Sequence, residues 1–354
     1  MKDEGRGKSA VGAPELDPTA IFEIFRGNYG TELLTAAVAH FRVFERLARS
    51  SLAREVLRGE LGLAERPFVV LLTALRAMQL VAVDRAGHCE LTPMAREHLV
   101  PGATFDVGDY IGLAADTAGV RDMIERLVTN TPLGHKPDEQ GVGFIYRENL
   151  PSAMEQEATA RHFTLALAGR AKNVAPVLAA RAPLGSVRRL LDVGGGTGIY
   201  SIACLQRYPR LRAVAWDRPE VLKVAAEMAA EYGVSDRLEL CPGDMFVDPL
   251  PQGADAVLLS NILHDWDVTE CQTLIARCAG ALPAGGRLLI HDVYLDDALD
   301  GPLPIALYSA ALFTFTEGRA YSAGEYRGWL AAAGLKPEAL IPTLIHCGVL
   351  PAIK

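Results

Sequence analysis

A glycine-rich turn in the second half of the chain has the residue types and spacing of a nucleoside site. The run LLDVGGGTG begins at Leu190 and has glycine at Gly194, Gly196 and Gly198. Glycine at alternate positions lets backbone approach a ligand closely, because no Cβ stands in the way. Asp217 ends the next apolar segment, where a carboxylate can accept hydrogen bonds from both ribose hydroxyls. We therefore predict Gly194, Gly196 and Asp217 as contacts of a bound nucleoside.

The spacing of this turn also indicates which nucleoside it binds. A dinucleotide site favours the pattern GxGxxG, in which pyrophosphate lies on the N–H groups that begin a helix. Here the pattern is GxGxG, and Asp192 stands directly before it. A carboxylate at that place repels a pyrophosphate but attracts a cation. S-adenosylmethionine carries a sulfonium and an ammonium and no phosphate, so the sequence favours it over NAD.

A second short motif fits the base of such a cofactor. Gly243-Asp244-Met245-Phe246 follows a third apolar run, at the place where a doubly wound sheet has its base pocket. Asp244 can accept a hydrogen bond from the adenine amino group. Met245 and Phe246 can enclose the ring between them. We predict Asp244 and Met245 as cofactor contacts.

His264 is the candidate for catalysis. It follows the apolar run DAVLLSNIL, at the edge of the sheet where such folds bind ligands. A neutral imidazole there can take a proton from a hydroxyl as a general base. A carboxylate must hold the imidazole in the correct tautomer, and the candidates are Asp292 and Glu317. Asp267 in the same run is explained by helix capping. No spacing of histidines and acids predicts a metal site.

The elements that must position these residues alternate between strand and helix from residue 187 onward. This pattern predicts an α/β fold with a mostly parallel, doubly wound sheet. A long helix is expected over 152–181, before the first strand. Residues 18–130 are expected to be mostly helical, with a winged helix that ends in two short strands on either side of Gly87.

Charge argues against a DNA-binding role for this winged helix. Residues 1–100 contain 13 Lys and Arg against 13 Asp and Glu, and the helix 65–80 has only Arg66 and Arg76 as cations. A helix that reads a groove needs a basic surround. The net charge of −8 likewise disfavours nucleic acids. We predict that the segment serves packing or dimerisation.

Four segments follow from these patterns, within a chain of 354 residues. Residues 1–16 are expected to be a disordered lead and 17–105 a winged-helix dimerisation domain. Residues 106–183 form a helical linker and substrate-pocket segment, and 184–354 the domain that binds S-adenosylmethionine. No apolar run of membrane-spanning length is present, and residues 1–18 lack the apolar core of a secretory signal. Six cysteines without a CxxC pair agree with a cytoplasmic protein.

The motifs, taken in order, resemble one enzyme family. They are DVGGGTG, WDRPEV, GDMF, LHDW, GGRLLIHD, TEGRAYS and EYRGWLAAAGL. This set is similar to that of the S-adenosylmethionine-dependent small-molecule O-methyltransferases of the caffeate and hydroxyindole type, especially their bacterial natural-product members. The resemblance covers about residues 18–354. It implies a class I methyltransferase fold, a homodimer formed through the N-terminal domain and a hydroxylated small molecule, aromatic or polyketide, as substrate.

The resemblance also implies roles for individual residues. Gly194, Asp217, Asp244 and Met245 fall at the family's cofactor contacts, His264 at its base, and Asp292 and Glu317 at the acids that flank the histidine. Ser260 and Asn261 depart from the plant members, which have Lys and Trp at these positions; Ser260 is retained here as a predicted cofactor contact.

Several alternatives stay open from the sequence. Some relatives bind S-adenosylmethionine but catalyse hydroxylation, decarboxylation or cyclisation, and the same scaffold supports N- or C-methylation. A regulator that senses S-adenosylmethionine is a third class. Arg161 and Arg170 are both candidates to hold the cofactor carboxylate. The pocket is expected between helix 152–181 and segment 302–316, and candidate wall residues are Phe163, Trp266, Tyr308, Phe313 and Phe315.

Overall fold

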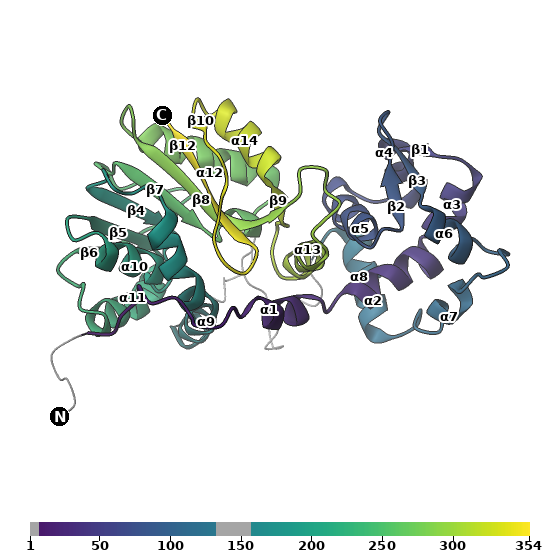
Figure 1. Cartoon of the computed structure of the whole chain (residues 1–354), viewed down its shortest axis with the longest axis horizontal. Coiled ribbons are helices and arrows are strands. Elements are labelled where there is room, and N and C mark those ends of the chain that lie inside the picture. The colour runs from purple at the N-terminus through teal and green to yellow at the C-terminus, as the bar shows by residue number, and fades with distance from the viewer. Residues whose placement is uncertain (1–6, 132–156) are drawn as a thin grey trace. The chain divides into compact units, whose positions relative to one another are not determined.

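A computed structural model of the chain describes residues 7–131 and 157–354, and its contacts divide it into two compact units (Figure 1). Among the described residues, the first unit comprises 7–22, 157–294 and 323–354, and the second comprises 23–131 and 295–322. Each unit gathers segments that are distant in sequence. The four consecutive segments expected from the sequence stay a prediction.

The first unit is built on a central sheet. Its strands are β4 (Arg189–Val193), β5 (Arg212–Asp217), β6 (Leu238–Pro242), β7 (Ala256–Ser260), β8 (Arg287–Leu295), β10 (Lys336–Pro337), β11 (Ile341–Pro342) and β12 (Cys347–Ile353). They run in the order β10-β12-β8-β7-β4-β5-β6, with β11 paired to β12. The strands from β6 to β8 are parallel, whereas β12 is antiparallel to β8. The strand order reverses between β4 and β7, and such a reversal opens a ligand crevice at the carboxyl ends of the strands.

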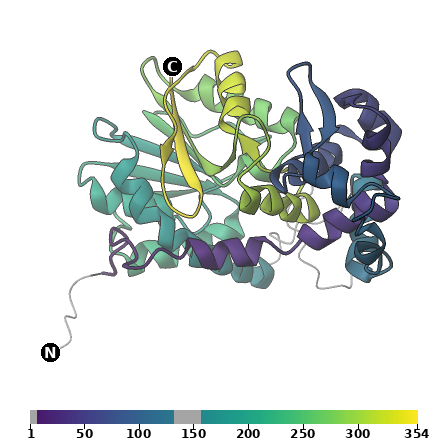
Figure 2. The same ribbon diagram turned by 45° about the vertical axis from the view of Figure 1, so that its right-hand side comes forward.

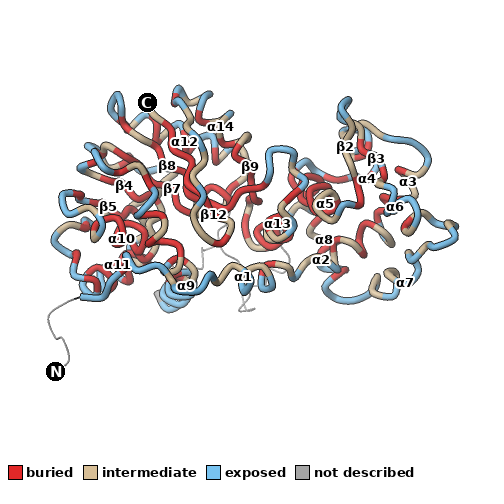
Figure 3. The backbone as a smooth tube through the Cα atoms, viewed as in Figure 1, coloured by how far each residue is buried: buried red, intermediate tan, exposed pale blue. Residues whose placement is uncertain are grey.

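Helices cover both faces of this sheet (Figure 1, Figure 2). One face carries α9 (Glu157–Arg181), α10 (Ile199–Arg207) and α11 (Pro219–Glu231), and the other carries α12 (Val268–Ala281) and α14 (Ala323–Ala332). The central strands β4, β5, β7 and β8 are buried along almost their whole length, as β7 and β8 show in Figure 3. A strand that is buried on both faces has a continuous apolar sequence, and this is the pattern found in the chain. The predicted α/β doubly wound fold is confirmed.

The second unit is mostly helical. Its helices are α2 (Gly30–Thr35), a π-helical turn (Ala36–His40), α3 (Val43–Arg49), α4 (Arg54–Leu61), α5 (Glu65–Ala77), α6 (Pro93–His98), α7 (Gly108–Gly112), α8 (Ala118–Thr129) and α13 (Leu303–Phe315). Strands β1 (Leu52–Ala53), β2 (Val81–Val83) and β3 (His88–Leu91) form a small antiparallel sheet in the order β1-β3-β2. Helix α5 is buried from Arg66 to Leu75 and packs against α13. The winged-helix assignment of this part stays a prediction.

Two further short elements belong to the chain. They are α1 (Thr19–Arg26) and β9 (Tyr321–Ser322).

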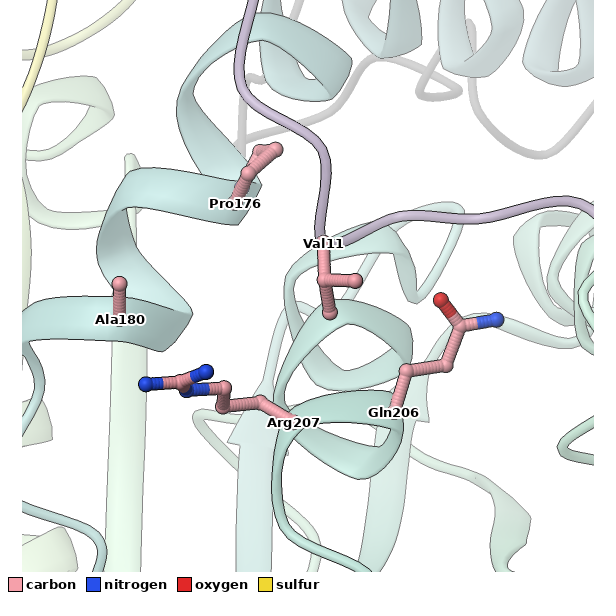
Figure 4. Close-up of a pocket in the computed structure, with 5 residues that line it drawn as sticks. All are labelled: Val11, Pro176, Ala180, Gln206 and Arg207. Carbon is pink, nitrogen blue, oxygen red and sulfur yellow. The ribbon is translucent and has the colours of Figure 1, made fainter.

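Residues 1–6 of the expected disordered lead lie outside the described residues, but residues 7–11 make specific contacts. The Gln206 amide donates to the Lys8 carbonyl at 2.8 Å and accepts from the Ala10 N–H at 2.7 Å. These paired bonds fix the segment on α10, where Val11 lines a shallow pocket of about 250 Å³ with Pro176, Ala180, Gln206 and Arg207 (Figure 4).

The described helices fall short of what a lipid bilayer requires. Within residues 7–131 and 157–354, none combines sufficient length with sufficient apolar character to cross a membrane.

Candidate active site

The glycine turn lies between β4 and α10, at the crevice in the sheet. Gly194, Gly196 and Gly198 all have positive φ, at 67°, 59° and 71°, which L side chains rarely adopt. A Cβ on Gly194 would lie 2.4 Å from the Ile262 Cδ1 atom, so this glycine admits close packing from the segment after β7. A Cβ on Gly196 would meet no heavy atom within 4 Å. The turn therefore presents bare backbone to open space, as a cofactor cradle requires.

Carboxylates surround this turn. The Asp217 Oδ2 accepts from the Gly196 N–H at 2.8 Å, and its Oδ1 accepts from the Arg218 N–H at 2.7 Å. Burial raises the pKa of Asp217. Asp192 is buried below the turn, where it accepts from the Ser201 hydroxyl at 2.7 Å, and burial raises its pKa to about 7. Buried acids favour a neighbouring cation, because a positive charge stabilises their ionised forms.

The segment after β6 lies next to Asp217. The Gly243 N–H donates to the Asp217 carbonyl at 3.0 Å. The Asp244 Oδ1 accepts from the Phe246 N–H at 2.8 Å, which closes a tight turn around Met245. The structure thus brings Asp244 and Met245 to the strand end beside Asp217. Phe246 packs edge-on against the Trp266 ring, with the ring centroids 4.6 Å apart.

Close packing at Gly243 gives a prediction for stability. A Cβ at this position would lie 2.2 Å from Trp216 Nε1, and the Trp216 indole is rigid and buried. We expect Gly243→Ala to lower the free energy of unfolding by about 1–3 kcal/mol, the usual cost of overpacking. Gly280→Ala on α12 is the matched control, since nothing lies within 4 Å of its Cβ position. Thermal melts of both variants decide this, and an unchanged Gly243→Ala melt would show that the indole can move aside.

His264 and Asp292 form a buried pair in which His264 follows β7 and Asp292 lies within β8. The chain leaves β7 through Asn261, whose φ is 57°, and enters a short 3-10 helix (Leu263–Asp265) that carries His264. His264 Nδ1 lies 2.5 Å from Asp292 Oδ1, and the two residues are 5% and 1% exposed. Asp292 also accepts from the Val293 N–H at 2.8 Å and from the Tyr326 hydroxyl at 3.4 Å. An ionised Asp292 can only accept, so His264 Nδ1 donates and its Nε2 carries the lone pair that a base needs.

Opposing effects set the protonation of His264. Burial lowers its pKa, but the carboxylates of Asp292 and Asp265 raise it, and the balance lies above the ordinary value. Asp265 Oδ1 lies 3.6 Å from His264 Nε2, and burial raises the pKa of Asp265 to about 6. The sequence reasoning missed Asp265, although its position directly after His264 was the available signal.

Ser260 lies in a different environment from the one expected. Its hydroxyl is 2.8 Å from His291 Nδ1 and accepts from the Asn261 amide at 3.2 Å. His291 points away from Asp292, as the alternation of strand side chains predicts. The role of Ser260 as a cofactor contact stays a prediction. The sequence reasoning assigned no site role to Asn261 or His291, which the structure places beside Ser260.

The structure distinguishes the two arginines that are candidates to hold the cofactor carboxylate. Arg161 makes an exposed, two-pronged ion pair with Glu227 of α11, at 2.8 and 2.9 Å. Arg170 lies on the same helix, and its guanidinium donates to the Asn261 side chain at 2.6 Å. Arg170 is therefore the arginine found next to the segment that carries His264.

Two other expected residues belong to the second unit. Glu317 lies in the second unit, between α13 and β9, and its role stays a prediction. Phe313 is in the core of the second unit, with the Arg66 guanidinium 4.8 Å from its ring centroid. Residues 132–156, which include the start of the expected helix 152–181, lie outside the described residues. No cluster of three or more metal-ligating side chains occurs in the described ranges 7–131 and 157–354.

Comparisons with known proteins show what the chain is similar to. A family model of the O-methyltransferase domain matches residues 144–336. The chain is 36% identical over 319 residues to 3-hydroxy-5-methyl-1-naphthoate 3-O-methyltransferase from Streptomyces sahachiroi, a match that covers 90% of this chain and 89% of the relative.

Solved structures show the same similarity. A crystal structure of an O-methyltransferase family 2 protein from Planctomyces limnophilus, in complex with apigenin, has 50% identity and a TM-score of 0.88, covering 99% of this chain and 100% of that one. Human N-acetylserotonin methyltransferase in complex with S-adenosylmethionine shares the fold, at 22% identity and a TM-score of 0.57, with coverage of 97% and 99%.

Proposed function

The chain belongs to the S-adenosylmethionine-dependent O-methyltransferase family, and from this premise we propose that it methylates an aromatic hydroxyl with His264 as general base. The observation that carries the proposal is the buried His264–Asp292 pair at the carboxyl edge of the sheet, 2.5 Å between Nδ1 and Oδ1. A histidine held in this tautomer directs its basic nitrogen away from the carboxylate, toward a substrate.

The cofactor is held by the turn and by the strand ends beside it. Gly194 and Gly196 supply bare backbone, and Asp217 supplies acceptors at the end of β5. Asp244 and Met245 lie at the end of the neighbouring strand β6, and the predicted adenine contacts are assigned to them. When bound, S-adenosylmethionine supplies an electrophilic methyl group on a sulfonium. The open space at Gly196 and the buried acids Asp192 and Asp217 fit such a cationic nucleoside.

The chain's own residues supply proton transfer and positioning. His264 Nε2 takes the proton of the acceptor hydroxyl as the oxygen becomes a nucleophile. Asp292 keeps the imidazole in place and stabilises the imidazolium that forms. The Asp265 carboxylate adds to this stabilisation, since it lies 3.6 Å from Nε2. A further part of the rate comes from holding the two reactants in line.

The class of acceptor is inferred from relatives. The Streptomyces relative is named for a hydroxynaphthoate, and the Planctomyces protein was solved with apigenin. Both molecules are planar aromatics that carry phenolic hydroxyls, so we infer an acceptor of this class. The base and its acid partner favour methyl transfer over hydroxylation, decarboxylation or cyclisation. The match to the O-methyltransferase family model favours oxygen over nitrogen or carbon as the acceptor.

We also infer that the protein acts as a homodimer formed through residues 17–105 and has neither nucleic acid nor membrane as partner. Helix α1 supports the dimer, because Ile21, Ile24 and Phe25 are strongly exposed. Light scattering in solution tests the dimer, and a mass of one chain at micromolar concentration would contradict it. A mobility-shift assay with generic DNA tests the absence of nucleic-acid binding.

A panel assay tests the proposed reaction. The protein is incubated with S-adenosylmethionine and apigenin, a hydroxynaphthoate or an aromatic amine of similar size. We expect S-adenosylhomocysteine and a product heavier by one methylene unit, in equal amounts, from the phenols alone. Methylation of the amine or of a ring carbon would point to the N- or C-methylation alternative. Cofactor turnover without a methylated product would contradict methyl transfer.

A further inference from the structure

A partly buried polar cluster joins strands β7 and β8 and the turn after β7 to helices α9 and α10. The Arg170 guanidinium donates to the Asn261 Oδ1 at 2.6 Å. The Asn261 amide nitrogen donates to the Tyr200 hydroxyl and to the Ser260 hydroxyl, each at 3.2 Å. Ser260 in turn bonds His291 at 2.8 Å. One asparagine side chain thus connects a helix, the start of the helix after the glycine turn and two strands.

The backbone at Asn261 decides where the next residues lie. Its φ of 57° is left-handed, a conformation that asparagine tolerates better than most residues, and its N–H donates to the His291 carbonyl at 2.8 Å. Directly after this turn, the Ile262 side chain lies against the Cα of Gly194. Two residues later, His264 meets Asp292. A single turn therefore sets the packing of the glycine turn and the position of the base.

Charge in the cluster also reaches the base. Three charged groups act on His264: Asp292 of β8, Asp265 of the same 3-10 helix and Arg170 of α9. The Tyr326 hydroxyl from α14 donates to the second oxygen of Asp292. The two carboxylates raise the pKa of His264, whereas the Arg170 charge lowers it. Arg170 is therefore placed to affect His264 in two separable ways, through the Asn261 hydrogen bond and through its charge.

We propose that Arg170 and Asn261 are positioning residues for methyl transfer: their hydrogen bond holds the left-handed turn that presents His264 to the acceptor and seats Ile262 against the glycine turn. This inference rests on the proposed role of His264 as base. It differs from the other role open to Arg170, which is direct binding of the cofactor carboxylate.

A double-mutant cycle tests the positioning role. Arg170→Met, Asn261→Gly and the double variant are compared with wild type at saturating substrates and at alkaline pH, where His264 is neutral in every variant. Glycine is chosen at position 261 because it adopts positive φ without strain. We expect each single change to lower kcat by about tenfold to a hundredfold, the effect of losing a charge-assisted hydrogen bond. The double variant should be no slower than the slower single variant, because both remove the same interaction.

Two kinetic outcomes would overturn the proposal. In the first outcome, both single variants keep a kcat within about twofold of wild type at saturating substrate. A change this small is what a substitution at an ordinary surface position gives. The second is additive losses, which would show that the two residues act independently. If Arg170→Met instead weakens S-adenosylhomocysteine binding in calorimetry and leaves saturated kcat unchanged, Arg170 holds the cofactor carboxylate and the positioning role is wrong.

An NMR titration of the His264 ring reads the charge coupling without any catalysis. Removing the Arg170 charge should raise the pKa of His264, so the midpoint should move to higher pH in Arg170→Met. It should stay near wild type in Arg170→Lys and in Asn261→Gly, since both keep the charge. Arg189→Met is the matched control. Arg189 lies at the start of β4, at the opposite end of the strand from the glycine turn, where it pairs with exposed Glu239. An unmoved midpoint in Arg170→Met would contradict the placement of Arg170 beside His264.

The titration also separates failure of this inference from failure of the proposed function. If His264→Ala keeps wild-type turnover, His264 is not the base, yet the titration still reports whether Arg170 acts on it. Circular dichroism melts of every variant establish that each one is folded.

Discussion

His264→Ala will lower kcat by about 10²- to 10⁴-fold, the usual contribution of a general base, while S-adenosylhomocysteine binds with nearly unchanged affinity. The imidazole is the only basic side chain that the structure pairs with Asp292 in the described part of the crevice. It follows β7, whereas five of the six predicted cofactor contacts lie at the ends of β4, β5 and β6, and the sixth, Ser260, bonds His291. Removing the imidazole therefore affects proton transfer and leaves the cofactor site in place.

The matched control for this variant is His88→Ala, which removes an exposed imidazole that lies beside Asp84 in the second unit. Turnover of a phenolic acceptor and calorimetry with S-adenosylhomocysteine are measured on both variants. Wild-type turnover in His264→Ala, with cofactor binding intact, would remove His264 from the mechanism. Loss of cofactor binding in His264→Ala would show instead that the imidazole supports the cofactor site.

Asp292→Asn should have the second large effect, with kcat lowered by about 10²-fold or more, because the imidazolium loses its partner charge. The amide is nearly isosteric and still offers an oxygen to the Val293 N–H, so the fold should persist. The Asp292 charge raises the pKa of His264, so its removal lowers that pKa. His264 is active when neutral, that is, above its pKa. The acid limb of the pH–rate profile should therefore move to lower pH, opposite to the shift expected for Arg170→Met.

Rates are measured across the acid limb for Asp292→Asn and for Asp236→Asn, an exposed control on the surface of the same unit. If the acid limb of the Asp292→Asn profile moves to higher pH or stays in place, the pairing of Asp292 with the base is contradicted. A profile equal to wild type in Asp236→Asn shows that the shift is specific to the partner of His264.

The sheet and the cofactor turn could be predicted from sequence because their signals are local. The apolar runs that alternate with amphipathic helices define β4 to β8, and the glycines at 194, 196 and 198 mark one turn. His264 and Asp292 could be chosen from the sequence as well, because His264 closely follows one apolar run and Asp292 interrupts another. Their pairing follows from the neighbouring positions of β7 and β8, which consecutive parallel strands commonly occupy.

The partly buried cluster around Asn261 could not be predicted, because its members are far apart in the chain. Arg170 and Asn261 are 91 residues apart, and Tyr200 and Asn261 are 61 apart. Each residue alone is compatible with an ordinary solvated or core position. The same holds for Gln206, which binds the N-terminal segment, and for α13, whose uniformly apolar sequence indicates burial but not its packing against α5. Only the three-dimensional fold brings these partners together.

The most direct test of His264 as a base compares acceptors of different acidity. A series of phenols of similar shape, with pKa values from above to below the assay pH, is methylated by wild type and by His264→Ala. An acceptor that is already ionised needs no base, so the ratio of wild-type to variant kcat should fall toward one as the phenol pKa drops below the assay pH. A ratio that stays large and constant across the series would contradict proton removal by His264 and assign the histidine another role.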